Sequence, residues 1–222
     1  MDSVIDIDAA RALVADVSLW PRVRDFLWDF AAQTHESWLA TEDRSAFDCR
    51  SLAKTSFRAK CFLLEKLGVE PCFYAFPKAG WSRLALLDGK TLESIAKWLG
   101  ALACANALRR VTDGATVREL KAALPGVYPE VFAFTAYFAG LKGLETEELK
   151  SGAAETVVRA GWRILRSLVK DVPEPVARRL ALKLPRDWSA FESSDSQIPP
   201  LQSFNLPLLL KLRFPEAYSL CC

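Results

Sequence analysis

The sequence predicts a mainly α protein, an irregular multi-helix bundle of roughly 8–10 helices. Residue usage is the first reason: Leu and Ala occupy 32 and 31 of the 222 positions, whereas Val and Ile together occupy 19. Leu and Ala are strong helix formers, while strands favour β-branched residues. Spacing is the second reason, because apolar residues recur every three or four positions along several segments. The 51% hydrophobic content can bury a core and so excludes intrinsic disorder.

The first fifty residues are acidic and rich in aromatic side chains. Asp8 can cap a short helix that runs through Val17, and Pro21 suits the first turn of a second helix. Large apolar residues then follow at short intervals, namely Trp20, Phe26, Leu27, Trp28, Phe30 and Trp38. Alone, such a helix pair would expose too much apolar surface. We therefore expect this segment to pack on another part of the protein.

The next part of the chain alternates helices with breaks. Residues 51–67 suit a helix that ends before Gly68. Residues 69–87 hold two prolines and several aromatic residues, which is typical of a connector, with room for one short strand pair. A well-defined helix starts at Thr91 and runs to about residue 110, with apolar residues at helical spacing.

The second half begins with a short helix over residues 117–124. The run 131–138 is apolar on nearly every side of a helix, so it is either buried or a docking surface. A long helix is expected over residues 146–170, and Glu174 starts a further short one.

Basic residues gather on these last two helices. The first carries a stripe of Arg159, Arg163, Arg166 and Lys170, and the second carries Arg178, Arg179 and Lys183. A solvated helix face is the default interpretation. The net charge of +2 does not favour nucleic-acid binding, and a core explains the nearby apolar residues as well as a membrane surface would. An acidic partner protein is the remaining interpretation, since modest charge patches steer association.

The predicted domain organisation is one helical domain over residues 1–191, a linker over 192–205 and a helical tail over 206–222 that docks on the core. Within the domain, residues 1–50 form the acidic aromatic part and 51–191 the core. The first fifty residues carry ten acids and five bases, and the remainder carries 17 acids and 24 bases. The chain is thus divided by charge, about −5 and then +7, which could supply two different faces.

Motifs for catalysis or cofactor binding are not found in the sequence. It contains no GxGxxG, GxxxxGK[ST] or GxSxG pattern, and its six cysteines form no CxxC pair. His35 is the only histidine and fits a helix end; pairing it with Cys49 or Cys61 as a nucleophile is the weaker interpretation. We therefore predict no catalytic, cofactor-binding or metal-binding residues, and no enzyme activity.

The chain is expected to stay in the cytoplasm. Its N-terminus is acidic where a secretory signal needs a basic region. The longest stretch without a charged residue spans only 15 positions between Asp195 and Lys211 and contains three prolines. That is too short and too interrupted for a membrane span.

Two stretches resemble the YscK/SctK-type accessory proteins of bacterial type III secretion systems. The first is LLDGKTL at residues 86–92, followed by WLGAL at 98–102 and LRRVTDGATVRELKAAL at 108–124. The second is the tail LLKLRFPEAYSLC at residues 209–221.

The resemblance implies a non-enzymatic cytoplasmic adaptor of the sorting platform beneath the injectisome. Such an adaptor links the cytoplasmic domain of the inner-membrane ring protein to the pod that carries the export ATPase complex. It reaches the membrane only through these partners and binds no nucleic acid. A stand-alone helical regulatory or chaperone-like protein-binding factor is the alternative.

The candidate partner-binding residues are arginines. Arg109, Arg110 and Arg213 lie in the two resembling stretches, although complementing a helix dipole or anchoring the tail would also explain them. The stripe residues Arg159, Arg163 and Arg166 complete the set.

Overall fold

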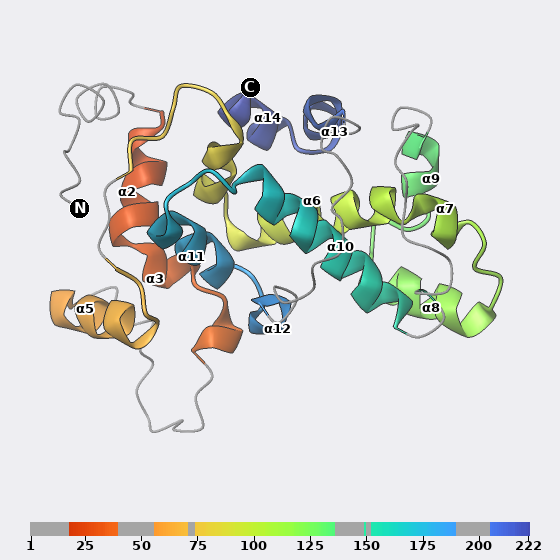
Figure 1. Ribbon diagram of the computed structural model, residues 1–222, viewed down its shortest axis with the longest axis horizontal. Helices are drawn as coiled ribbons and strands as arrows, with labels where there is room; N and C mark the ends of the chain where they lie inside the picture. The colour runs from red at the N-terminus through yellow and green to blue at the C-terminus, as the bar shows by residue number, and fades with distance from the viewer. Residues whose placement is uncertain (1–17, 40–55, 71–73, 136–148, 150–151, 190–204) are drawn as a thin grey trace. The chain divides into compact units, whose positions relative to one another are not determined.

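The computed structural model describes residues 18–39, 56–70, 74–135, 149, 152–189 and 205–222. These residues form twelve α-helices, two 3-10 helices and no strand, which confirms the mainly α fold (Figure 1). The chain divides into two compact units. The first comprises Met1–Lys90, Val169–Ser189 and Leu220–Cys222, and the second comprises Thr91–Leu168 and Ala190–Ser219.

The described helices of the first unit come from both halves of the sequence. They are α2 (Trp20–Trp28), α3 (Phe30–Gln33), η1 (Glu36–Trp38), α5 (Phe57–Lys66), η2 (Trp81–Leu86), α11 (Glu174–Leu182) and α12 (Arg186–Ser189). The buried face of α2 presents Phe26 and Leu27 to the interior. Phe30, from the next turn, packs with Leu63 of α5 and Leu182 of α11. The aromatic N-terminal segment therefore packs on neighbouring helices, as its composition required.

The described part of residues 69–87 contains no strand. Trp81–Leu86 form the 3-10 helix η2 instead, with Leu84, Ala85 and Leu86 buried. The prediction of a short strand pair there is wrong. The backbone carbonyls of Ala85 and Leu87 accept hydrogen bonds from the side chain of Lys183, so no neighbouring strand is needed to satisfy them.

The second unit is organised around two helices that cross closely. Its elements are most of α6 (Gly89–Ala103), α7 (Ala105–Leu108), α8 (Gly114–Ala123), α9 (Val131–Phe134), α10 (Ala153–Leu168), α13 (Leu206–Arg213) and most of α14 (Pro215–Cys221). Figure 1 shows α10 lying across α6. Glycines permit this approach: a Cβ on Gly161 would lie 1.8 Å from the Ala96 oxygen, and one on Gly100 would lie 1.9 Å from the Val157 oxygen.

Two helix boundaries differ from the predicted ones. The helix expected from Thr91 to about residue 110 is interrupted at Cys104, so that α6 and α7 are separate. The long helix expected over residues 146–170 begins at Ala153 in α10. Gly152 has a φ of 69°, which an α-helix cannot include, so the helix cannot start earlier.

Some predicted features lie outside the described residues. These are the helix over residues 8–17, nearly all of the linker over 192–205, the last three residues of the run 131–138, and Cys49 and Cys72.

Candidate partner-binding surfaces

Two of the predicted arginines, Arg109 and Arg213, come together around α9. The Arg213 guanidinium stacks 4.6 Å from the Phe134 ring centroid and 4.7 Å from that of Trp98 in α6. It also forms an ion pair with Glu130, the residue before α9. Arg213 ends α13, so its side chain fastens that helix to α6 and α9. This is the tail anchoring that the sequence had left as an alternative role.

Arg109 also contacts α9, at Phe132 and at Thr135, which follows the helix. Its guanidinium lies 5.9 Å from the Phe132 ring centroid and donates a hydrogen bond to the Thr135 hydroxyl. The backbone of Arg109 caps α7, and Arg110 follows it as an exposed residue. Both residues are exposed, and the printed contacts with α9 are those of Arg109.

The stripe arginines occupy one side of α10. Positions 159, 163 and 166 follow at intervals of four and three residues, which places them on one helix face. Arg159 forms an ion pair of 2.6 Å with Glu155 one turn earlier, and Arg166 is exposed. The opposite face is buried through Val157, Ile164 and Leu165. Three of the four predicted stripe residues thus share a face of α10, where Arg166 is exposed; the fourth, Lys170, is exposed beyond the end of the helix.

The second basic cluster does not form a solvated face. Arg179 is 1% exposed and donates to the Glu70 carbonyl at 3.0 Å, with its guanidinium 5.9 Å from the Phe30 ring centroid. Arg178 donates to the Leu67 carbonyl at 3.2 Å and lies over the ring of Trp38. Both side chains tie α11 to the end of α5 and the connector that follows.

Lys183 is 3% exposed and lies inside the first unit. Its ammonium donates to the Ala85 and Leu87 carbonyls at 2.7 and 2.8 Å and lies 4.9 Å from the Phe26 ring centroid. Burial lowers the pKa of Lys183 to about 7, and the negative charge of Asp88 opposes that shift. The default interpretation of a solvated basic face is therefore wrong for Arg179, and Lys183 nearby is buried as well.

The burial of Arg179 and Lys183 could have been predicted from their spacing along the helix. Arg179 and Lys183 lie three and seven positions after Val176, on the same helix face as the buried Val176 and Leu180. The number of basic residues on α11 alone does not indicate this burial, because it takes no account of the helix face on which each residue lies.

Another buried cation, Arg83 of η2, forms a hydrogen bond with the backbone near the C-terminus. Its Nε donates to the Pro77 carbonyl at 2.6 Å, and its Nη1 donates to the Leu220 carbonyl at 3.1 Å. The Gly80 amide donates to the Cys221 carbonyl at 2.8 Å. Burial raises the pKa of the Cys221 thiol to about 12, so this thiol stays protonated and unreactive.

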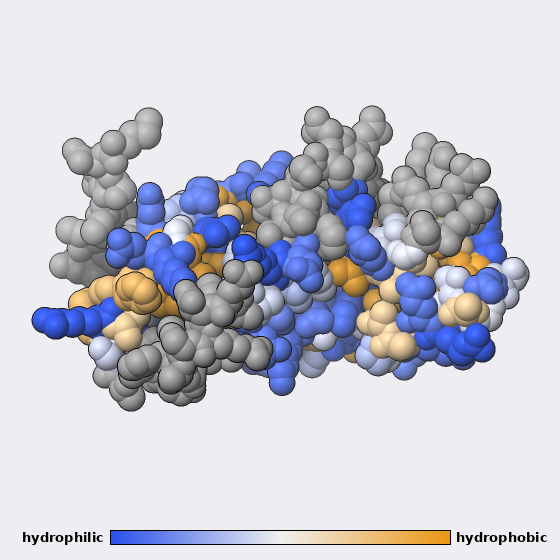
Figure 2. Space-filling model, turned by 90° about the horizontal axis from the view of Figure 1, so that it is seen from below, coloured by the Kyte–Doolittle hydropathy of each residue, from blue (hydrophilic) through white to orange (hydrophobic). Residues whose placement is uncertain are grey.

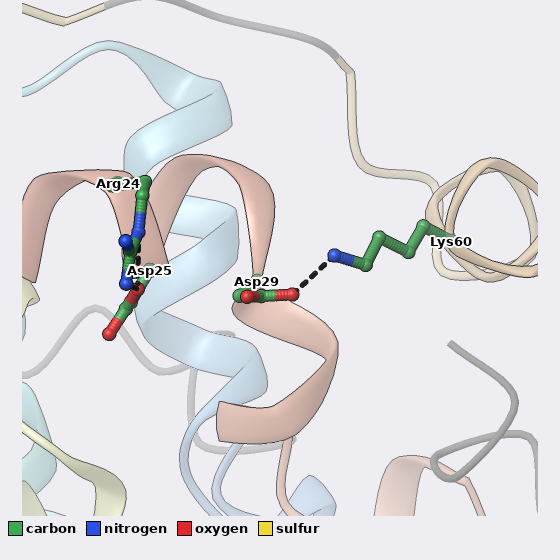
Figure 3. A network of polar contacts seen from close by, with 4 residues as sticks. All are labelled: Arg24, Asp25, Asp29 and Lys60. Atoms are coloured by element: carbon green, nitrogen blue, oxygen red, sulfur yellow. Dashed lines mark hydrogen bonds and ion pairs between the residues drawn. The ribbon is translucent and has the colours of Figure 1, made fainter. Parts of the chain in front are cut away.

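The first unit also leaves large aromatic residues on its surface, including Trp28 of the N-terminal segment that was expected to pack. Trp28 is 52% exposed on α2, and Phe57 and Phe62 are 78% and 59% exposed on α5. Figure 2 shows hydrophobic beside hydrophilic surface at the end where α5 lies. The two helices are joined by an ion pair of 2.5 Å between Asp29 and Lys60, while Arg24 pairs with Asp25 at 2.8 Å (Figure 3).

The sequence model of one protein family, described as YOP proteins translocation protein K (YscK), matches residues 24–213. The chain belongs to the YscK family. It is therefore a component of a type III secretion apparatus, a protein-transport system linked to virulence, and it interacts with other proteins of that apparatus. Neither the curated proteins nor the solved structures contain a significant match.

The YscK family comprises secretion-apparatus components and is not a known enzyme family. His35 in this member is the N-cap residue of η1, where its Nδ1 accepts a hydrogen bond from the Ser37 amide, as expected for a helix-end histidine. Within the described residues, no group of His, Cys, Asp and Glu is placed to hold a metal ion. No helix among them is long and apolar enough to cross a bilayer.

Proposed function

We propose that this YscK-family protein is a non-enzymatic cytoplasmic adaptor. It links the cytoplasmic domain of the inner-membrane ring protein to the sorting-platform pod that carries the ATPase complex. The family match over residues 24–213 is the observation that carries the proposal. It works at the cytoplasmic face of the inner membrane and reaches that membrane through its partners.

The distribution of surfaces supports a two-partner role. The second unit presents the arginine face of α10, and the first unit presents exposed aromatic residues on α2 and α5. A protein that bridges two partners needs two surfaces of different chemistry, because one shared surface would make the partners compete.

The test reverses the charge of the α10 face by changing Arg159, Arg163 and Arg166 together to Glu. Arg166 is exposed and Arg159 and Arg163 are half-buried on the side of α10 away from Val157 and Ile164, so we expect the helix to stay packed and the binding of one partner to weaken. Pull-down of the purified ring-protein domain and pod protein, with thermal unfolding as a fold check, measures this.

The matched control replaces the same three arginines with Lys, which keeps the positive charge. Unchanged capture of both partners by the Glu variant would contradict a role for the α10 face. Loss of both partners from a folded Glu variant would contradict two separate surfaces.

The remaining candidates differ in how they can be tested. Arg110 is exposed, so we propose Arg110→Glu as a direct probe of partner contact. Arg109 and Arg213 stay in the proposed contact set, but their contacts with α9 mean that substitution also loosens the fold. For these two variants, the free energy of unfolding has to be measured together with binding, so that a loss of stability is not mistaken for a loss of contact.

A further inference from the structure

Helix α5 has an outer face on which several large side chains are exposed. Its inner side packs through Leu63, with Leu67 just beyond its end, while Phe57, Cys61 and Phe62 face outward. Two phenylalanines more than half exposed on one ten-residue helix are unfavourable in water, and aromatic residues are enriched at the centres of protein interfaces.

The charges on this face follow a pattern along the helix. Arg58 lies four positions before Phe62 and Lys66 four positions after it, so the three side chains form one basic–aromatic–basic stripe. Both cations are exposed, and within the described residues neither forms an ion pair. At 1.5 Å per residue, their positions are about 12 Å apart along the axis.

Two carboxylates of the same unit, among the residues that the structure describes, already have basic partners. Asp29 is held by Lys60 and Asp25 by Arg24, so neither is free to neutralise the stripe (Figure 3). Glu65 is the single acid on α5 and lies beside the stripe. The local charge pattern therefore favours carboxylates supplied from outside.

We propose that the Arg58–Phe62–Lys66 stripe of α5, with Phe57 beside it, docks an acidic amphipathic segment of one of the two adaptor partners. The segment carries an apolar side chain between two carboxylates spaced about two helical turns apart. Phe62 buries the apolar side chain, and Arg58 and Lys66 pair with the carboxylates at the rim. This inference rests on the proposed adaptor function and assigns one of its two contacts.

A lipid surface fits the stripe less well. Aromatic and basic side chains also suit an anionic membrane, but stable binding there needs a longer amphipathic helix or a polybasic patch. The α5 helix offers ten residues, an adjacent carboxylate and two cations that form no ion pair with a residue of the described ranges. The observations therefore favour a protein segment.

The exposed thiol of Cys61 provides a probe next to Phe62. The full-length protein is treated with a maleimide, alone and with purified ring-protein domain or pod protein, and alkylation is followed by peptide mass spectrometry. We expect one partner to slow alkylation of Cys61 about tenfold while the exposed Cys222 reacts at an unchanged rate.

Two variants test the chemistry of the contact. The double variant Arg58→Glu with Lys66→Glu should weaken the protecting partner about tenfold and reverse the salt dependence of its binding. Arg58→Lys with Lys66→Arg preserves the charges and is the matched control. Phe62→Ser should also weaken that partner, whereas Leu212→Ser, which changes an exposed leucine of the second unit, should not.

The remaining outcomes separate the two proposals. Binding of a partner with unchanged Cys61 alkylation and no effect of the variants overturns the docking site and leaves the adaptor function standing. Binding of neither partner by the wild-type chain overturns both. Protection of Cys61 by phosphatidylglycerol vesicles alone, or by raising the protein's own concentration, would assign α5 to a membrane or to a second copy and overturn the proposal.

Discussion

Buried cationic side chains in the first unit donate hydrogen bonds to backbone carbonyls that lie outside the α-helices. Lys183, Arg179 and Arg83 each donate to carbonyl groups in or beside η2 and the connectors, where no helix hydrogen bond is available. An unsatisfied buried carbonyl is unfavourable, and a charged donor makes a strong hydrogen bond with it. Burying the charge is itself unfavourable, and for Lys183 this appears as a pKa lowered to about 7.

The lowered pKa of Lys183 predicts a pH dependence of stability. Between pH 7 and pH 10.5 the unfolded chain holds a proton on Lys183 that the folded protein has lost, so the free energy of unfolding rises with pH across this window. Below pH 7 both states are protonated, and this contribution no longer changes. Relative to Lys183→Met, the wild-type protein should gain on the order of 2 kcal/mol of stability between pH 7 and pH 9.

Urea unfolding of both proteins at several pH values measures this difference. The Met variant controls for every other group that titrates in the same range. Parallel stability curves for the two proteins would show that Lys183 keeps an ordinary pKa in the folded state.

At the level of helices, the crossing of α6 and α10 sets the position of the arginine face. Gly100 and Gly161 face each other's backbones, so the helices approach until carbonyl oxygens occupy the space of a side chain. That contact fixes which side of α10 is buried, and therefore which side carries Arg159, Arg163 and Arg166 outward.

Replacing Gly161 with Ala should therefore destabilise the protein strongly. The new Cβ would lie 1.8 Å from the Ala96 oxygen, and backbone atoms on both helices cannot move aside as a flexible side chain could. We expect a loss of about 3 kcal/mol or more in urea unfolding. Gly114→Ala is the matched control: nothing lies within 4 Å of that Cβ, and Ala favours helix, so stability should stay equal or rise slightly. Equal stability of Gly161→Ala and the wild type would refute the close crossing.

The whole molecule is built from segments that are distant in the sequence. The first unit draws on three stretches and the second on two, so neither unit is a continuous piece of chain. The tail illustrates this: α13 buries Leu206, Leu209 and Leu210 in the second unit, and Arg213 stacks on Trp98 there. We propose that residues 206–219 of the tail are a structural part of that unit; the last three residues, Leu220–Cys222, belong to the first unit, and the tail as a whole was expected to dock on the core.

A fragment of residues 1–191 tests this role. It lacks α13, and losing three buried leucines at roughly 1.5–3 kcal/mol each should remove most of the stability of the second unit. Hydrogen exchange should show early opening of α6 and α10, and denaturant unfolding should lose cooperativity. Leu212→Ser in the full chain is the control, because that leucine is 53% exposed. A fragment as stable as the full chain would show that the tail adds nothing to the fold.

Much of the helical fold could be predicted because helical periodicity is local. The inner face of α10 follows from Val157, Gly161 and Ile164 in sequence, although Leu168, expected on the same face, is only half-buried, and α13 matches the expected span of residues 206–213. The contacts of the candidate arginines could not be predicted in the same way, because they join residues that are distant in sequence. Arg109 and Arg213, about a hundred residues apart in sequence, each contact a different residue of α9, and nothing in either local pattern indicates this.

Composition, spacing and motifs were thus sufficient for the helical class, most helix positions, the family and the presence of an arginine face on α10. Folding determined which basic residues reach the surface, and it placed Arg179 and Lys183 inside. It also made Trp81–Leu86 a 3-10 helix in place of a strand. The reason is physical: the carbonyls that Lys183 satisfies belong to residues 98 and 96 positions away, so the partner that makes its burial favourable exists only in the assembled chain.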